Sequence, residues 1–167
     1  MCQGNCPKYL NKKKIRPVTP KPKLVSDGPT LPPEAIALLS KADLLFISSS
    51  NADKDADTNI RGGPPGFVRM LSNGEDGAEI MYPEYSGNRL YQTLGNLIIT
   101  PRAGLVFPDF ETGDVLYLTG ITEVLIGPDA TKVLPHSNVA VKIKITEARF
   151  VTQGLPFRGI TLSLIHI

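Results

Sequence analysis

The segment Arg61-Gly62-Gly63-Pro64-Pro65-Gly66-Phe67-Val68-Arg69 has the most unusual local composition in this chain. Its prolines stiffen the approach to an apolar run. Its glycines remove side chains that would keep a planar ligand away from backbone N–H and C=O groups. Two interpretations fit these residues equally well. The segment is either a loop that runs into a strand and offers its backbone to a ligand, or a rigid corner of a β-barrel.

A second polar segment, Tyr82-Pro83-Glu84-Tyr85-Ser86-Gly87-Asn88-Arg89, stands before a short helical pattern. Free N–H groups at a helix start, small polar side chains and a guanidinium group together suit an anion such as phosphate. Arg61 or Arg69 could contribute a second positive charge. The alternative is an ordinary helix cap with a surface arginine, and these residues alone favour that alternative.

The rest of the chain predicts a mainly β fold, because its apolar runs are rich in Val, Ile, Leu, Phe and Tyr. The clearest run alternates apolar residues from Val139 to Ile145 with polar or small ones, which is typical of an antiparallel strand with one wet face. Turn residues 72–77 predict a hairpin. Short helices are expected over residues 34–39 and 89–97. The predicted strands cover residues 44–48, 67–71, 78–82, 103–107, 115–126 and 139–151.

The strings RGGPPGFVRM, YPEYSGNRLYQTLGNLIITPRAGLVF and DVLYLTG follow one another in the chain. Together they resemble the FMN-binding split β-barrel proteins related to pyridoxamine 5′-phosphate oxidase, and the resemblance extends from Ala42 to Val151. It implies an antiparallel split β-barrel with a few short helices. It also implies bound FMN, an oxidoreductase that passes electrons through this flavin, and a site between two barrels. The partner is then a second copy of the chain or a second barrel in the same chain.

The resemblance also implies which residues bind the cofactor. A strand along the isoalloxazine ring corresponds to Arg61, Phe67, Val68 and Arg69. The turn that holds the phosphate corresponds to Ser86, Gly87, Asn88 and Arg89, with Gln92 and Asn96 beside it. No catalytic residue is assigned.

The chain departs from pyridoxamine 5′-phosphate oxidase itself in two respects. Its phosphate turn reads SGNR, and the C-terminal substrate-binding segment of the oxidase is not recognisable. These departures argue against vitamin B6 oxidation, so the substrate is unassigned. The alternative function is a non-catalytic flavin-binding or dimerisation module that serves an attached reductase.

The positive charge of the chain is concentrated near its beginning. The net charge is only +2, but seven Lys and Arg residues lie between Lys8 and Lys23 with no acidic residue before Asp27. Prolines interrupt the same region and prevent a continuous helix or a central strand. Composition favours a solvated linker here, with a wrapping arm or a nucleic-acid contact as alternatives. The mild net charge does not make nucleic acid the expected partner.

We therefore divide the chain into an arm over residues 1–33, a barrel over residues 34–155 and a tail over residues 156–167. The opening Gly4-Asn5-Cys6-Pro7-Lys8-Tyr9-Leu10 resembles the end of a preceding barrel, and related fungal-type chains continue into a reductase region. The final Leu162-Ser163-Leu164-Ile165-His166-Ile167 resembles a translated sequencing adapter. These likenesses predict a fragment of a longer oxidoreductase.

Several other classes are not supported by the sequence. No apolar run is long enough to span a membrane, and the first 30 residues lack the apolar core of a secretory signal. Two cysteines and no Asn-x-Ser/Thr sequence give no sign of an oxidising compartment, so a cytoplasmic location is predicted. The Asp53-x-Asp55-x-Asp57 stretch lacks the glycine and glutamate of a calcium loop and predicts a solvated acidic loop. The two histidines have no zinc-like spacing, and no metal site is expected.

Overall fold

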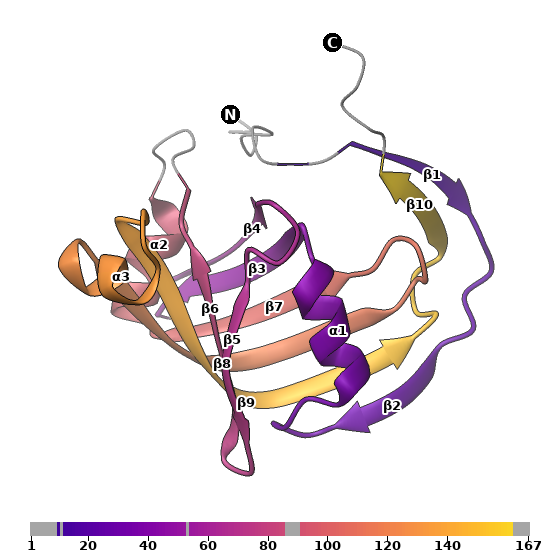
Figure 1. The fold of residues 1–167 in the computed structure, drawn as a ribbon, viewed down its shortest axis with the longest axis horizontal. Coiled ribbons are helices and arrows are strands. Elements are labelled where there is room, and N and C mark those ends of the chain that lie inside the picture. Colours follow the sequence, from indigo (N-terminus) through magenta and orange to yellow (C-terminus); the bar gives the residue numbers. More distant parts are fainter. Residues whose placement is uncertain (1–9, 11, 53, 86–90, 162–167) are drawn as a thin grey trace.

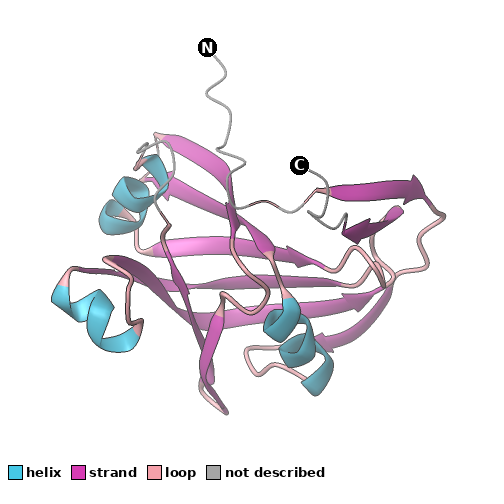
Figure 2. Ribbon diagram, turned by 45° about the horizontal axis from the view of Figure 1, so that its top comes forward, coloured by secondary structure: helices cyan, strands magenta, loops and turns pink. Residues whose placement is uncertain are grey.

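The computed structural model describes residue 10 and residues 12–52, 54–85 and 91–161. The described chain forms ten strands and three short helices (Figures 1 and 2). The helices are α1 (Pro33–Lys41), α2 (Gln92–Ile99) and α3 (Pro128–Val133). The strands are β1 (Lys13–Pro17), β2 (Lys23–Asp27), β3 (Leu44–Asn51), β4 (Asp55–Gly62), β5 (Arg69–Gly74), β6 (Gly77–Pro83), β7 (Arg102–Pro108), β8 (Val115–Ile126), β9 (Val139–Thr152) and β10 (Phe157–Thr161).

Eight of these strands form one curved antiparallel sheet in the order β4-β3-β7-β8-β9-β6-β5, with β2 also pairing to β9. The 14-residue strand β9 lies at the centre of this sheet. One edge of β9 pairs with β8 along most of its length, and the other edge pairs first with β6 and then with β2. Strands β4 and β5 are the two ends of the sheet, and they leave the barrel split. The predicted antiparallel β fold with a few short helices is confirmed.

The core lies between the inner face of this sheet and α1, which rests against the sheet in Figure 1. Helix α1 buries Ala35, Leu38 and Leu39, one stripe of an amphipathic helix. The alternation predicted for β9 is confirmed, because Val141, Ile143 and Ile145 are at most 1% exposed while the lysines between them are half-buried. The largest fully buried side chains include Tyr82, Phe107, Phe150, Leu45, Ile47 and Leu116.

Three local predictions are corrected by the structure. The acidic stretch is not a solvated loop, since β4 begins at Asp55 and pairs with β3 over eight residues. The strand predicted from Phe67 begins at Arg69, so Phe67 and Val68 belong to the preceding loop. Helix α2 runs from Gln92 to Ile99 instead of ending at Leu97. Composition was a poor guide to β4 because polar side chains are tolerated on an edge strand, and β4 is held by its pairing with β3 along its whole length.

The proline-rich arm is not the solvated linker that its composition favours. Its residues 13–17 form β1, which pairs with β10, and residues 23–27 form β2, which pairs with the end of β9. Pro17 ends the first strand, while Pro20 and Pro22 lie between the two strands, where no ladder hydrogen bond is lost. The arm and the tail therefore form a two-stranded ribbon at one end of the molecule (Figure 1).

Asn73 joins the predicted hairpin to the start of α1. Its amide accepts from the backbone N–H of Leu31 and donates to the Leu31 carbonyl, both at 2.9 Å. We expect Asn73→Ala to lower the free energy of unfolding by about 1–3 kcal/mol in urea titrations, because two backbone groups lose their partner. Ser72→Ala, the exposed neighbour, should change it by less than about 0.5 kcal/mol. Equal effects would contradict a specific role for the Asn73 amide.

No helix within the described residues is long and apolar enough to cross a membrane.

Candidate functional site at the split of the barrel

A largely buried ion pair links the two sides of the split. The Nε atom of Arg61, next to last in β4, donates to Oε2 of Glu84 at 2.8 Å, and the side chains are 16% and 13% exposed. Glu84 follows β6 and is held by a hydrogen bond from its own backbone N–H to the Val139 carbonyl at 2.9 Å. Strand β5 pairs with β6 only as far as Arg69 and Met81, so the last residues of β6 have β9 alone as a neighbouring strand.

The surroundings of this pair have a low dielectric constant. Burial raises the pKa of Glu84 above its ordinary value, although the charge and hydrogen bond of Arg61 act in the opposite direction. Burial also raises the pKa of Tyr82 above its usual range. The Tyr82 hydroxyl is fully buried and has no hydrogen-bond partner among the described residues. A buried hydroxyl without a partner is uncommon and marks a place where a further polar group would be stabilising.

A polar cluster lies beside the ion pair at the beginning of α2. The amide of Asn59 on β4 donates to Oγ1 of Thr93 at 3.0 Å and also to the Asp57 carboxylate. The amide of Asn96 donates to Oγ of Ser49 on β3 at 3.1 Å, and Thr93 and Asn96 are only 1% and 6% exposed. These bonds fix α2 on the edge of the sheet.

Helix α2 has no side-chain cap at its first turn within the described structure. Its first N–H groups therefore lack a side-chain acceptor from the cap residue and lie at the positive end of the helix dipole, an arrangement that suits an anion. Residues 86–90 connect β6 to this helix.

The structure brings some of the predicted cofactor residues together and separates others. Arg61 and Asn96 lie on adjoining elements, since Asn59 of β4 contacts α2 two residues before Arg61, and exposed Gln92 begins the same helix. Ser86, Gly87, Asn88 and Arg89 lie outside the described residues. Their predicted role in holding phosphate stays a prediction.

The loop that contains Phe67 and Val68 turns away from this cluster. Both side chains are 4% exposed and belong to the core, while Val68 and Arg69 line a pocket of about 300 Å³ against α1. The structure gives Phe67 and Val68 a packing role, and any contact of Phe67, Val68 and Arg69 with a cofactor stays a prediction.

The glycines of this loop are explained by packing. A Cβ on Gly63 would lie 2.6 Å from the Phe67 ring, and one on Gly66, where φ is +77°, would lie 2.8 Å from the Ser40 carbonyl oxygen. Only glycine permits approaches this close. The interpretation of the segment as a rigid barrel corner therefore accounts for Gly63 and Gly66.

Glu84, Asn59 and Thr93 were not singled out by the sequence. Each is an ordinary polar residue in its own segment. The position of α2 on β4 brings Asn59 to Thr93, and the split of the barrel brings Glu84 to Arg61. The one available signal was the polar residue at every second position of β4, at Asp57, Asn59 and Arg61.

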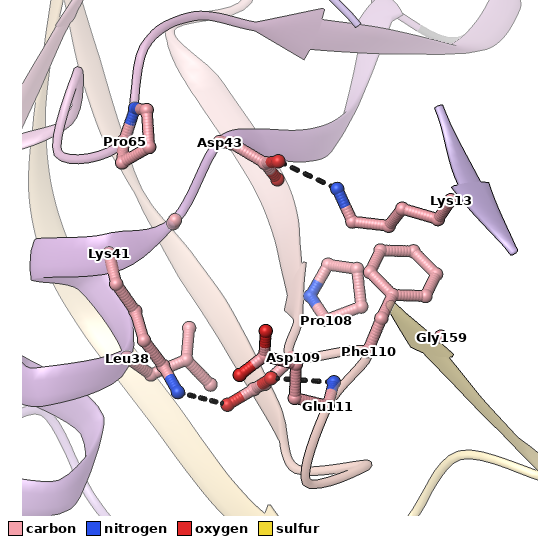
Figure 3. Close-up of a pocket in the computed structure, with 11 residues that line it drawn as sticks. Lys13, Leu38, Lys41, Asp43, Pro65, Pro108, Asp109, Phe110, Glu111 and Gly159 are labelled. Atoms are coloured by element: carbon pink, nitrogen blue, oxygen red, sulfur yellow. Dashed lines mark hydrogen bonds and ion pairs between the residues drawn. The ribbon is translucent and has the colours of Figure 1, made fainter. Parts of the chain in front are cut away.

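A second concave region holds two more ion pairs but none of the predicted cofactor residues (Figure 3). Lys13 of β1 contacts Asp43 at 2.6 Å, and Lys41 at the end of α1 contacts Asp109 at 2.5 Å. Burial alone would raise the pKa of Asp109, but hydrogen bonds from Lys41, Glu111 and Thr112 hold it below its ordinary value. The pairs attach the ribbon and α1 to the barrel.

Comparison with solved structures identifies the architecture. A putative pyridoxamine 5′-phosphate oxidase from Lactobacillus delbrueckii is 22% identical and superposes with a TM-score of 0.53 over 75% of this chain and 98% of its own. This chain has the split β-barrel fold of the pyridoxamine 5′-phosphate oxidase-like proteins.

The same split barrel occurs in further proteins of low identity. An FAD-binding protein from Mesorhizobium loti is 10% identical, with a TM-score of 0.52 over 78% of this chain and 97% of its own. A variant of HupZ from Group A Streptococcus is 16% identical, with a TM-score of 0.52 over 72% of this chain and 99% of its own. No family model and no curated protein matches the sequence. At these identities the likeness to split barrels concerns the fold.

Proposed function

We propose that this chain is an FMN-binding oxidoreductase domain that passes electrons through the bound flavin. The observation that carries the proposal is that Arg61 and the uncapped start of α2 lie on adjoining elements at the split of the barrel. The phosphate would be held by α2 N–H groups and by the Ser86–Arg89 turn.

The residues around the split fit such a ligand. Phosphate needs convergent N–H donors and a cation, and α2 and Arg61 supply both types of group. The buried Tyr82 hydroxyl, which has no partner among the described residues, and the raised pKa of Glu84 support the proposal, because both indicate a polar region that is shielded from water. FMN itself would supply the redox chemistry, while the protein would bind it, orient it and keep water away.

The proposal includes a second barrel, either in another copy of this chain or elsewhere in a longer chain that carries a reductase region. Exposed apolar side chains support such a partner. Tyr117 and Ile121 on β8 are 44% and 51% exposed, and Ile98 and Ile99 at the end of α2 are 63% and 60% exposed. A contiguous exposed apolar patch is typical of an association surface, and the proposed partner would cover these side chains.

A flavin titration tests the binding proposal. Wild-type protein should bind FMN, and Arg89→Ala should weaken binding by about 1.5–3 kcal/mol, at least tenfold in Kd, through loss of a charge-assisted phosphate contact. Riboflavin, which lacks the phosphate, should bind both proteins equally. Lys54→Ala, an exposed lysine in the β3–β4 turn, is the matched control. Purified protein that gains no flavin absorbance with excess FMN would refute the proposal.

The non-catalytic alternative differs in what the bound flavin does. An oxidoreductase domain should show reduction of its FMN by NADH or NADPH under anaerobic conditions, alone or with the downstream region attached. If neither NADH nor NADPH reduces the bound FMN, in the chain alone or with the downstream region attached, this chain belongs to the class of flavin-binding or dimerisation modules.

A further inference from the structure

The ribbon of β1 and β10 carries an unneutralised cluster of positive charge. In its register Arg16 lies directly opposite Arg158, and Lys14 lies opposite Ile160. Side chains two residues apart share a face of a strand, so Lys14 and Arg16 stand on the same face as Arg158. None of these three side chains makes an ion pair within the described residues, although other basic side chains of the molecule do.

This arrangement violates an ordinary rule of strand pairing. Like charges directly opposite each other in an antiparallel pair are destabilising, and the contacts that attach the ribbon to the barrel, such as the Lys13–Asp43 ion pair, do not neutralise Arg16 or Arg158. Departures from local rules of this kind concentrate at functional sites. An anion bound between Arg16 and Arg158 would replace their mutual repulsion by attraction of both guanidinium groups to the anion.

Arg158 is held in place. Its Nη1 atom donates to the carbonyls of Leu155 and Phe157, both at 2.9 Å, and its side chain is half-buried. The guanidinium group lies against the backbone of Gly113, where φ is +83° and a Cβ would be 2.1 Å from the guanidinium carbon. The remaining N–H groups of Arg158 have no partner among the described residues, so a fixed fork is available to an anion.

The cluster borders a concave region of about 420 Å³ formed by Lys14, Ile15, Arg16, Glu111, Arg158, Gly159 and Ile160. Three cations border one carboxylate there, and Ile160, opposite Lys14 on the same face, adds apolar surface at 61% exposure. This volume is within the range of small-molecule sites. The ribbon lies at the opposite end of the molecule from α2 and α3 in both views (Figures 1 and 2), so the region is separate from the split.

We infer that the β1–β10 ribbon binds a small phosphate-bearing ligand between Arg16 and Arg158, with Lys14 as a third cation. Phosphate fits because its oxygens can accept from two guanidinium groups at once. The exposed Ile160 beside the cations suits the organic part of a phosphate ester. The site does not depend on flavin binding at the split.

Phosphate-dependent stability tests the ribbon site. In a chloride buffer of low ionic strength, inorganic phosphate should raise the Tm of wild-type protein and bind measurably by calorimetry. Arg16→Gln and Arg158→Gln should each weaken phosphate binding at least tenfold, whereas Lys54→Gln, which removes the same charge elsewhere, should leave it unchanged. Without phosphate, Arg16→Gln should be as stable as wild type or more stable, because the repulsion from Arg158 is gone.

Each comparison has an outcome that overturns the inference. If phosphate raises the Tm of Arg16→Gln as much as it raises the Tm of Lys54→Gln and of wild type, no phosphate site exists at the ribbon. Arg16→Lys, which keeps the charge, should retain most of the affinity for phosphate. If the folded Arg16→Lys protein loses this affinity, the phosphate binds elsewhere. If the protein binds a long oligothymidylate much more tightly than a short one, the ligand of the ribbon is a nucleic acid and not a small phosphate ester. FMN affinity should be the same in Arg16→Gln and wild type.

Discussion

Replacing Arg61 with alanine should lower the free energy of unfolding by about 3 kcal/mol near pH 8, because it leaves the Glu84 carboxylate buried without its partner. A surface ion pair would not have this effect. Lys132 and Asp129 are 74% and 70% exposed, and Lys132→Ala should cost less than about 1 kcal/mol. Urea unfolding of the two variants under the same conditions makes the comparison.

The effect of Arg61→Ala should depend on pH in a defined direction. Burial keeps the pKa of Glu84 above its value in the unfolded chain, so the folded state binds more protons in the interval between the two values. The free energy of unfolding therefore falls as the pH rises through that interval. Loss of Arg61 raises the folded pKa further and widens the interval. The difference between variant and wild type should grow with rising pH and shrink below the ordinary pKa of a glutamate, about 4.3.

A double variant shows whether Arg61→Ala loses stability through its broken ion pair or through lost packing of the Arg61 side chain. If the cost of Arg61→Ala comes from a stranded carboxylate, then Arg61→Ala combined with Glu84→Gln should be more stable than Arg61→Ala alone near pH 8. An unchanged or additive loss in the double variant would mean that the Arg61 side chain stabilises the split by packing and not by its charge.

Replacing Gly77 with alanine should destabilise the fold by about 3 kcal/mol. Gly77 begins β6 at a φ of +100°, where a residue with a Cβ is strained by about 1–2 kcal/mol. The added Cβ would also lie 2.4 Å from the Ile145 carbonyl oxygen of β9, and overpacking of this kind typically costs about 1–3 kcal/mol. Thermal and urea unfolding both measure the loss.

Gly74 provides the control in the same hairpin. It pairs directly with Gly77, yet a Cβ at Gly74 would meet nothing within 4 Å. Gly74→Ala should therefore change the free energy of unfolding by less than about 1 kcal/mol. If the two substitutions have the same effect, the close approach of β6 to Ile145 does not constrain the hairpin.

The hairpin and the central strands were predictable because their signals are local. Turn residues at 72–77 and the alternation from Val139 to Ile145 each report on a few neighbouring side chains. Both predictions are confirmed by the pairing of β5 with β6 and by the burial of one face of β9. In contrast, β4 and β1 are strands chiefly because a partner strand accepts their backbone hydrogen bonds, and their polar or basic composition gives little local sign of it.

The sequence by itself determined the mainly β fold class and the resemblance to split barrels, and it predicted a phosphate turn over residues 82–89, which stays a prediction. Only the tertiary structure decided that Arg61 pairs with Glu84 across the split, that Phe67 and Val68 are buried, and that Arg16 stands opposite Arg158. Alternation and turn composition act over a few residues, whereas strand register joins residues that are far apart in the chain. Strand register also decides which charged side chains meet, so the sequence of one strand does not predict the charge that lies opposite it.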